Sequence, residues 1–216
     1  QAEFINRGVS HYFPGSVFKV VIAAAALEEG LVSPEEIFEC TGEYKFESGL
    51  VIPCWKEKGH GKLSFREALA HSCNPVFIEL GLRLGEEKIS EYAKRFGLDS
   101  TTLVGYPLQN YPSINIDKNS PGAIGNAVLG QKGIKLSPLQ VAKLYAVIAN
   151  NGIYHEPSIV MRIESTNKKV IKNFLPHQGQ KVISYKTAQE LRKMLHLTTT
   201  LGTAQNAWIP GWGSAG

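Results

Sequence analysis

The sequence predicts an α+β domain, on the strength of three observations. An apolar run without a helix breaker occupies residues 17–27, serine-based helix-start signals recur along the chain, and two segments have the composition of small β-hairpins. The chain has 216 residues, of which 43% are hydrophobic and 19% are charged. This length and composition are those of one globular domain with a sizeable core.

The first predicted helix begins at Ser16, directly after a Pro-Gly pair, and ends before Gly30. Its alanine run at residues 23–26 has no polar face, so most of the helix is expected to be buried. Lys19 follows Ser16 by three residues and therefore lies one turn away on the same helix face. A lysine amine in that position can take the proton of the serine hydroxyl and turn it into a nucleophile. The helix N-terminus adds a backbone N–H and a positive dipole end where an oxyanion would form.

The Ser-x-x-Lys spacing is weak evidence by itself. With 15 serines and 17 lysines among 216 residues, chance gives about one match. A second match, Ser165 and Lys168, lies in a polar turn, and we interpret it as a chance occurrence. Ser16 differs because a Pro-Gly pair precedes it and an apolar helix follows it.

The next elements are short. Ser33, Pro34 and Glu36 form a start signal for a helix of about one turn. Residues 38–55 are expected to hold one small hairpin, which a tight loop at residues 59–61 follows.

A pair of helices is predicted to meet at a bend over residues 72–74. Ser64 and Glu67 form a capping box at the start of the first, and Pro75 ends it. A further amphipathic helix follows, with Gly97 as its stop. The three helices are expected over residues 65–71, 76–84 and 86–96.

The second half of the chain is predicted to contain a long loop, two helices and a pair of strands. Residues 98–122 are rich in Pro, Asn, Ser and Tyr without a clear period, which indicates a functional loop or a lid. The elements expected after it are a helix over 139–151 stopped by Gly152, two strands within 153–175, a helix over 185–197 capped by Ser184, and a loop-like segment over 198–216.

The charge pattern limits the classes of partner that the sequence predicts. A net charge of +4 and a pI near 8.9 come from basic residues scattered along the chain. We therefore expect a solvated, mildly basic surface and no nucleic-acid partner. The longest apolar run, residues 20–27, is far too short for a membrane span. No signal peptide is visible at Gln1, where the chain is expected to begin within a longer protein.

Three cysteines are present. Cys40 and Cys54 flank a short segment of the predicted hairpin and could face each other. Two interpretations stay open, namely a disulfide if the protein works outside the cytoplasm, or two reduced, half-buried thiols. The spacing of cysteine and histidine along the chain matches no zinc motif, so neither a metal nor a cofactor is expected.

Ser72 and Asn74 form a second group of chemically useful side chains. They lie two residues apart on the predicted bend, so a hydroxyl and a carboxamide can project into one cleft. The hydroxyl can relay a proton, and the amide can hold a substrate amide with its donor and its acceptor at once. A serine that caps a helix is the simpler interpretation of Ser72 taken alone.

Several motifs in this order resemble the transpeptidase domain of a class B penicillin-binding protein, of the serine D,D-transpeptidase and β-lactamase-like superfamily. The motifs cover nearly the whole chain: Phe-Pro-Gly-Ser-x-x-Lys at 13–19, His-Gly at 60–61, Ala-Leu-Ala-His-Ser-Cys-Asn-Pro-Val-Phe at 68–77, Ala-Val-Leu-Gly-Gln at 127–131, Leu-Ser-Pro-Leu-Gln-Val-Ala at 136–142, Ala-Asn-Asn-Gly at 149–152 and Glu-Pro at 156–157. The small departures are Ser137 for the usual threonine and Lys132 where glycine is common, while Cys73 is a known choice between Ser72 and Asn74.

The resemblance implies a D,D-transpeptidase that cross-links peptidoglycan and that β-lactams acylate. Ser16 would attack the penultimate D-Ala of a stem peptide, Lys19 would be the base, Ser72 would pass a proton to the leaving amine, and Asn74 would bind the substrate amide. It also implies an N-terminal membrane anchor, a position on the extracytoplasmic face of the cell membrane, and a glycosyltransferase partner. The fold would be the penicillin-binding, serine β-lactamase-like one, mostly its helical part.

The family's third motif, Lys-Thr/Ser-Gly, is expected just beyond the end of this chain. Residues 202–204, Gly-Thr-Ala, match the segment before it, and Ala215-Gly216 match the residues that immediately precede its lysine. Residues 1–216 are therefore expected to be an incomplete single domain that lacks later strands of the central sheet. We expect such a chain to be catalytically weak, and to expose an apolar face of the helix over residues 17–27 unless something covers it.

Three other interpretations remain. A β-lactamase shares Ser-x-x-Lys but needs a group that activates water, and the Glu-x-x-x-Asn device of class A enzymes does not occur in this sequence. A penicillin sensor or another inactive penicillin-binding module would have the same site residues. A fragment without a function of its own would show no cooperative melting transition.

Overall fold

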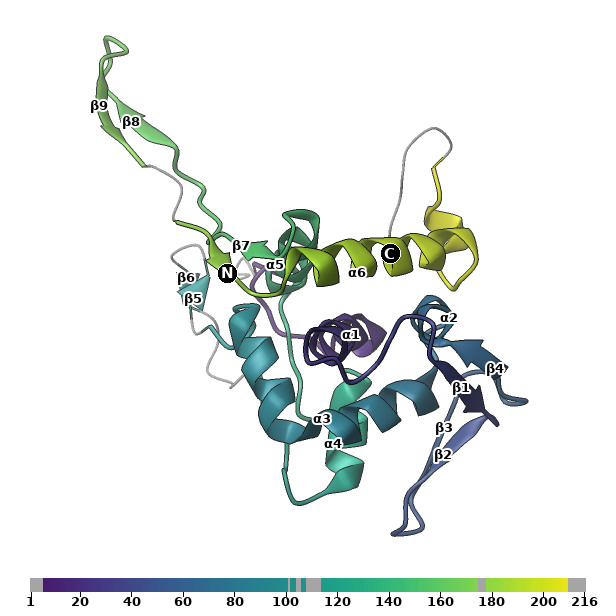
Figure 1. Ribbon diagram of the computed structural model, residues 1–216. Helices are drawn as coiled ribbons and strands as arrows, with labels where there is room; N and C mark the ends of the chain where they lie inside the picture. The colour runs from purple at the N-terminus through teal and green to yellow at the C-terminus, as the bar shows by residue number, and fades with distance from the viewer. Residues whose placement is uncertain (1–5, 101, 104–105, 108–113, 175–177, 210–216) are drawn as a thin grey trace.

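The computed structural model describes residues 6–100, 102–103, 106–107, 114–174 and 178–209 (Figure 1). Its helices are η1 (Gly15–Phe18), α1 (Lys19–Glu28), α2 (Phe65–Ala70), α3 (Asn74–Arg95), α4 (Pro121–Val128), α5 (Pro138–Ala149), α6 (Tyr185–Thr200) and η2 (Gln205–Ala207). Its strands are β1 (Ile37–Cys40), β2 (Glu43–Lys45), β3 (Val51–Pro53), β4 (Gly61–Ser64), β5 (Thr102–Leu103), β6 (Tyr106–Pro107), β7 (Ile153–Tyr154), β8 (Arg162–Glu164), β9 (Val170–Asn173) and β10 (Gln180–Lys181). This mixture of helices and short strands confirms the predicted α+β class.

All sheets in these described ranges consist of two antiparallel strands. The pairs are β1–β4, β2–β3, β5–β6, β7–β10 and β8–β9. Helices therefore form the body of the molecule, and the strand pairs lie around it (Figure 1).

Helix α1 lies at the centre of the core. Figure 1 shows α6 on one side of it and α3 on the other, and α1 contacts both of these helices as well as α2. Residues 21–26 of α1 have no exposed surface, and Val20 is only 3% exposed. This helix therefore exposes no apolar face over residues 20–26, because other helices of the chain cover it. The alanine run explains why, because side chains of one carbon let neighbouring helices approach from several directions.

The C-terminal end of α1 is fastened to the start of α6 by Glu28. Its carboxylate accepts hydrogen bonds from the Ser184 backbone N–H at 2.9 Å, from the Ser184 hydroxyl at 2.9 Å and from the Thr187 hydroxyl. Ser184 is the N-cap of α6, so the carboxylate also faces the positive end of that helix.

Replacing Glu28 with alanine is expected to lower the free energy of unfolding by about 1–3 kcal/mol, because the donors of Ser184 and Thr187 would lose their shared acceptor. Chemical denaturation of the two proteins measures this. Glu87→Ala, at an exposed position of α3, is the matched control and should change the free energy of unfolding by less than about 0.5 kcal/mol. Equal effects of the two substitutions would contradict the assigned role of Glu28.

Most helix ends are where the sequence predicts them. The capping box of Ser64 and Glu67 is present at α2, and Ser184 caps α6. The predicted break between residues 84 and 86 appears as a kink inside α3 at Gly85, whose φ is +74°. Gly30 adopts a φ of +67° just after α1, as expected for a residue that ends a helix.

For the segment before α2, one prediction is wrong and another is confirmed. Residues 33–36 form a turn and not a helix, although the Ser33 N–H does face Glu36 Oε2 at 3.4 Å. The expected hairpin is present as β2 and β3 over residues 43–53, while β1 pairs outside it with β4, from Ile37–Ser64 to Cys40–Gly61. Pairing with a distant strand outweighs the local capping signal, because it satisfies a whole row of backbone groups.

Helix α4 lies within the segments where the sequence predicted no helix. Its signal was available, because Ser120 caps it by accepting from the Ala123 N–H and Pro121 occupies the first turn. The expected strands within residues 153–175 are present as β8 and β9, and Figure 1 shows this hairpin projecting away from the body.

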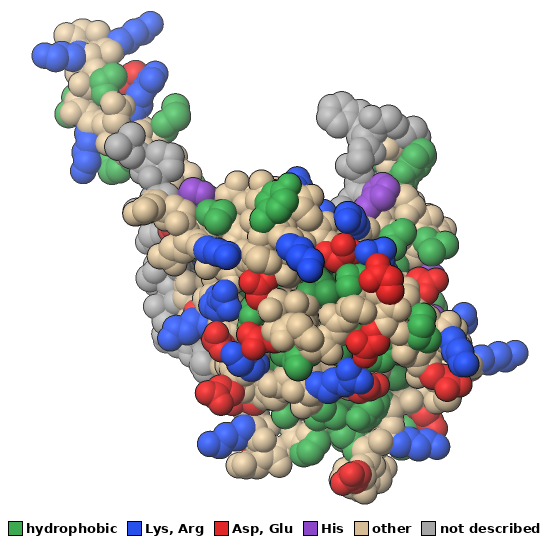
Figure 2. Space-filling view, in the orientation of Figure 1, with side chains coloured by type: hydrophobic (Ala, Val, Ile, Leu, Met, Phe, Trp, Pro, Cys, Tyr) green, Lys and Arg blue, Asp and Glu red, His purple; other side chains and the backbone are tan. Residues whose placement is uncertain are grey.

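The surface agrees with the charge pattern of the sequence. Figure 2 shows Lys and Arg side chains intermixed with Asp and Glu over the described residues of the face in view. Among the described helices, none combines the length and the apolarity that crossing a membrane requires.

Candidate active site

Ser16 lies at the surface, at the start of the central helix. It is the second residue of η1, which leads directly into α1, so its N–H is one of the first-turn donors that have no partner within the helix. Ser16 is exposed, whereas Phe18 and residues 19–26 of α1 are buried. The predicted nucleophile is thus accessible and held at the end of a rigid element.

Lys19 is the first residue of α1, and it is almost completely buried, with 1% of its surface exposed. Its ammonium nitrogen Nζ lies 2.8 Å from the Ser72 carbonyl oxygen, 2.9 Å from Ser72 Oγ and 2.7 Å from Asn74 Oδ1. The Phe77 ring centroid is 5.7 Å from Nζ. A buried amine with three oxygen neighbours is fixed in position, which a base that acts on one proton requires.

Ser72 and Asn74 reach this place from the bend between α2 and α3. Ser72 has a φ of +52°, an unusual conformation for a residue other than glycine, and Asn74 is the first residue of α3. The strained bend turns the Ser72 hydroxyl and the Asn74 carboxamide toward the same lysine. The structure therefore brings Ser16, Lys19, Ser72 and Asn74 together from segments more than 50 residues apart in the sequence.

The hydrogen bonds place Ser72 between the nucleophile and the base. Ser72 Oγ lies 2.8 Å from Ser16 Oγ and 2.9 Å from Lys19 Nζ. The sequence suggested a direct contact between Ser16 and Lys19, whereas the described link runs through the Ser72 hydroxyl. When Lys19 is neutral, it can donate to the Ser72 carbonyl and to Asn74 while it accepts from Ser72, and Ser72 can in turn accept from Ser16.

Asn74 holds the base in this arrangement. Its Oδ1 accepts from Lys19 Nζ, and its Nδ2 donates to the Pro53 carbonyl at 3.0 Å. Both ends of the carboxamide therefore have partners before any substrate arrives. A substrate amide could use Asn74 only by sharing Oδ1 or by replacing the Pro53 carbonyl. Pro53 was not among the predicted residues, and a backbone carbonyl leaves no sequence signal.

Burial gives Lys19 the pKa that a base needs. Removal of the amine from water lowers its pKa from 10.5 to about 8, against the smaller raising effects of Cys73 and Cys54. About a tenth of such a group is neutral at pH 7, compared with well under a thousandth of an ordinary lysine.

We expect the rate of acylation at Ser16 to depend on pH through Lys19. The base must be neutral, so the rate should rise by about tenfold per pH unit below pH 7 and level off above pH 8. Stopped-flow acylation by a chromogenic β-lactam at pH 5.5 to 9.5 measures the profile. A flat profile across this range would contradict Lys19 as the base.

Gly130 sets the position of the turn that carries Ser16. The Gly15 N–H donates to the Gly130 carbonyl at 3.0 Å, and a Cβ added to Gly130 would lie 2.0 Å from the Gly15 carbonyl oxygen. Gly130 also has a φ of +66°. Only glycine allows the two backbones to approach this closely.

Gly130→Ala is therefore expected to push the Ser16 turn aside and to slow acylation by about 10²-fold. The matched control is Gly30→Ala, because Gly30 has nearly the same φ of +67° but no atom within 4 Å of an added Cβ. Both variants carry the backbone strain, and only the first carries the clash. Acylation rates and melting temperatures of the two variants separate these effects, and equal acylation rates would contradict the role of Gly130.

A cavity of about 160 Å³ adjoins the site. It is lined by residues of α1, α2, α5 and α6 together with residues 203–204, and Ser16, Lys19 and Ser72 are among them. The Gly-Thr-Ala segment at residues 202–204 is held there because the Thr203 N–H donates to the Ala70 carbonyl at 3.1 Å. Ala215 and Gly216 lie outside the described residues. A larger cavity of about 490 Å³ shares no lining residue with this one.

The second Ser-x-x-Lys match has no such surroundings. Ser165 and Lys168 lie in the turn between β8 and β9, where Lys168 has a φ of +63° and the Ser165 hydroxyl contacts Asn167 and the Lys169 carbonyl. Both residues belong to the projecting hairpin and not to the core. The interpretation of this match as a chance occurrence fits its place in the structure.

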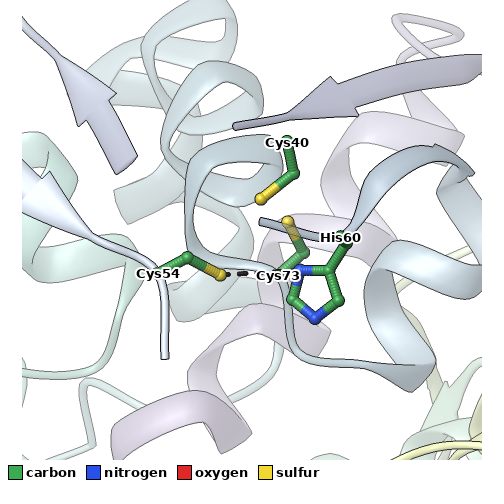
Figure 3. A group of neighbouring side chains, drawn as sticks. All are labelled: Cys40, Cys54, His60 and Cys73. Atoms are coloured by element: carbon green, nitrogen blue, oxygen red, sulfur yellow. Dashed lines mark hydrogen bonds between the residues drawn. The ribbon is translucent and has the colours of Figure 1, made fainter. Parts of the chain in front are cut away.

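A group of sulfur and nitrogen donors, which the sequence did not predict, lies beside the site. Cys40, Cys54 and Cys73 are buried free thiols, and together with the His60 ring nitrogen their ligand atoms lie within 4.8 Å of one another (Figure 3). Cys73 is the residue between Ser72 and Asn74. Of the two interpretations, the structure has the free thiols, but Cys40 and Cys54 are buried and share their place with a third cysteine and a histidine.

Comparison with known proteins gives consistent matches. A family model for the penicillin binding protein transpeptidase domain matches residues 3–216. Stage V sporulation protein D of Bacillus subtilis is 34% identical over 94% of this chain and 32% of its own length. A peptidoglycan D,D-transpeptidase, PbpA of Mycobacterium tuberculosis, is 33% identical over 95% of this chain and 42% of its own length.

A solved structure agrees with these relatives. The penicillin G acyl-enzyme complex of penicillin-binding protein A from M. tuberculosis superposes with a TM-score of 0.85 at 30% identity, over 98% of this chain and 48% of that one. The chain thus spans about a third to two fifths of the length of the curated relatives named here.

Proposed function

The chain belongs to the penicillin-binding protein transpeptidase domain family, and from this premise we propose that it acts in a peptidoglycan D,D-transpeptidase that works through an acyl-enzyme at Ser16. The observation that carries the proposal is the hydrogen-bonded series from Ser16 through Ser72 to the buried Lys19. A match to the family alone would also be found for a domain that has lost its catalytic residues. The intact series of nucleophile, relay and base is what favours an active site.

In the proposed acylation step, Ser16 Oγ attacks the carbonyl carbon of the penultimate D-Ala of a stem peptide. The Ser16 proton passes to Ser72 Oγ, whose own proton passes to Lys19 Nζ. The peptide bond to the terminal D-Ala then breaks, and the leaving amine takes a proton back from Lys19 through Ser72. An oxyanion that forms on the way can accept a hydrogen bond from the Ser16 N–H.

In the second step, an amine of another stem peptide attacks the acyl group and restores the Ser16 hydroxyl. The same residues act in reverse, because Lys19 accepts the proton that the attacking amine loses. A β-lactam enters the first step as a mimic of the D-Ala-D-Ala end and stays bound to Ser16. Asn74 acts here by positioning Lys19 and by offering Oδ1 to the substrate amide.

We further propose the setting of this reaction from the family. Residues 1–216 would form part of a single transpeptidase domain on the extracytoplasmic face of the cell membrane, in a protein with a membrane anchor and a glycosyltransferase partner. This position places the site next to the peptidoglycan stem peptides that it would join.

The experiment is covalent labelling of the protein that carries this domain by a fluorescent penicillin, followed by peptide mapping. We expect one adduct, on the peptide that contains Ser16, and release over a much longer time than labelling takes. Transfer from a D-Ala-D-Ala thioester analogue to an added amine then tests the second step. Labelling at another residue would overturn the proposal, and rapid turnover of the β-lactam without transfer would indicate a hydrolase.

A further inference from the structure

The donor group beside the active site is built from four separate segments. Cys40 ends β1, Cys54 follows β3, His60 precedes β4, and Cys73 is the N-cap of α3. Figure 3 shows the four side chains pointing toward a common centre, with Cys54 Sγ 3.6 Å from His60 Nδ1. Three of the four residues are buried, and His60 is partly buried.

Two glycines let these segments come together. A Cβ on Gly59 would lie 2.1 Å from the Cys40 carbonyl oxygen, and one on Gly42 would lie 2.1 Å from the Glu57 carbonyl oxygen. Both have a positive φ, of +74° and +105°. The loop before β4 is therefore pressed against the end of β1, which carries His60 to the cysteines.

We propose that Cys40, Cys54, His60 and Cys73 bind one Zn²⁺ ion as a closed, tetrahedral site of three thiolates and one imidazole. This ligand set is typical of structural zinc, which takes four protein ligands and leaves no position for substrate. Sulfur ligands at zinc bond lengths stand about 3.8 Å apart, so donors within 4.8 Å need to move by about one ångström. Each thiol gives up a proton when it binds, and the ion takes its place.

The surroundings of His60 favour an ion over a merely apolar cluster of thiols. Its Nδ1 has only the weak partner Cys54 Sγ at 3.6 Å, and its Nε2 is buried without a hydrogen-bond partner among the described residues. The ring is held in place by Trp55 and His71, whose ring centroids are 5.2 and 5.7 Å away. A fixed, poorly paired imidazole that faces three sulfurs is arranged as a ligand.

The sequence gives no zinc motif for this site, because the four ligands are far apart along the chain. Thirteen residues separate Cys40 from Cys54, and twelve separate His60 from Cys73. The four ligands contain no Cys-x-x-Cys pair, which is the spacing that indicates a zinc site in a sequence. The pairing of β1 with β4 and the bend before α3 supply the proximity instead.

The site would also stabilise the position of the proposed base. Cys73 lies between Ser72 and Asn74, which contact Lys19, and Cys54 follows Pro53, whose carbonyl accepts from Asn74. An ion bound by both Cys54 and Cys73 would connect the segment of Pro53, which accepts from Asn74, to the bend that carries Asn74 itself. We therefore expect loss of the metal to lower thermal stability and to slow acylation at Ser16. This second expectation rests on the proposed function, whereas metal binding does not.

The test begins with metal analysis of the reduced protein, purified without chelators. We expect inductively coupled plasma mass spectrometry to find about one zinc per chain. Substitution with Co²⁺ should give the intense visible absorption bands of a tetrahedral thiolate site. Cys40→Ser and Cys54→Ser should each lower the zinc content and weaken the cobalt spectrum. Ser16→Ala should keep one zinc while it loses penicillin labelling, which separates this proposal from the proposed function.

Further measurements cover the case in which a cysteine variant does not fold. His60→Gln removes the proposed imidazole ligand and should lower the zinc content. Its control is His196→Gln, which removes an exposed histidine of α6 and should keep one zinc per chain. Wild-type protein stripped by a chelator should take back one equivalent of Zn²⁺ in competition with a chromogenic chelator, and should then melt at a higher temperature. Zinc below a tenth of an equivalent with no uptake would overturn the proposal, and so would a Cys40–Cys54 disulfide in protein purified under reducing conditions.

Discussion

Ser16→Ala is expected to abolish covalent labelling by penicillin, with a loss of at least about 10⁴-fold in the rate of acylation. The physical reason is that the reaction needs an oxygen nucleophile at this position, and no neighbouring group can replace it. Ser72 Oγ lies 2.8 Å away and is the hydroxyl that contacts Ser16 Oγ among the described residues. Ser16 is exposed whereas Ser72 is partly buried, so only the former is presented to a substrate.

The chain offers its own matched control for this substitution. Ser165→Ala removes the serine of the other Ser-x-x-Lys match, at an exposed turn far from the core. We expect Ser165→Ala to be labelled like the wild type and Ser16→Ala to keep the wild-type melting temperature within a few degrees. Labelling is read by gel fluorescence and peptide mapping. Substantial labelling of Ser16→Ala would mean that the acylated residue lies elsewhere.

Lys19→Met is expected to slow acylation by roughly 10²–10⁴-fold, the usual contribution of a positioned general base. Methionine has a similar length and suits an apolar interior, so the fold should be retained better than with a polar replacement. The three oxygen atoms around Nζ would lose their donor, and this costs some stability. The remaining activity should no longer depend on pH near 8, because the group that titrates there is gone.

Lys143→Met is the control for Lys19→Met. Lys143 is the other buried lysine of the described core, with 3% exposure, and it faces Glu156 at 3.5 Å and the Gly97 carbonyl at 3.4 Å instead of Ser16. Burial lowers the pKa of Lys143 as well, although Glu156 opposes the effect. We expect this variant to lose stability but to keep the pH profile of acylation. If both variants kept that profile, the base would have to be a group other than Lys19.

The central place of Ser72 bears on how these results are interpreted. If the proton of Ser16 leaves through Ser72, replacement of either Ser72 or Lys19 interrupts the same path. Their effects should then not add, since groups that act as one unit lose most of the rate with the first substitution. The hydrogen bonds from Ser16 to Ser72 and from Ser72 to Lys19 are the geometric reason to expect this.

Local sequence signals predicted much of this protein, because they depend on atoms a few residues apart. The capping box of Ser64 and Glu67, the break at Gly85 and the end of α1 at Gly30 are of this kind. The order of the motifs added Ser72 and Asn74 to the candidate site. Local signals also misled, since the start signal at residues 33–36 gave way to the pairing of β1 with β4.

The sequence by itself determined most of the helices, the family and the four residues that carry the proposed chemistry. Only the tertiary structure decided how they connect: that the link from Ser16 to Lys19 runs through Ser72, that Gly130 fits against Gly15, and that α1 is covered on all sides. It also decided that Cys40, Cys54, His60 and Cys73 share one centre. These features depend on distances between segments that are far apart in the chain, and such distances are fixed by packing and strand pairing, which no local pattern records.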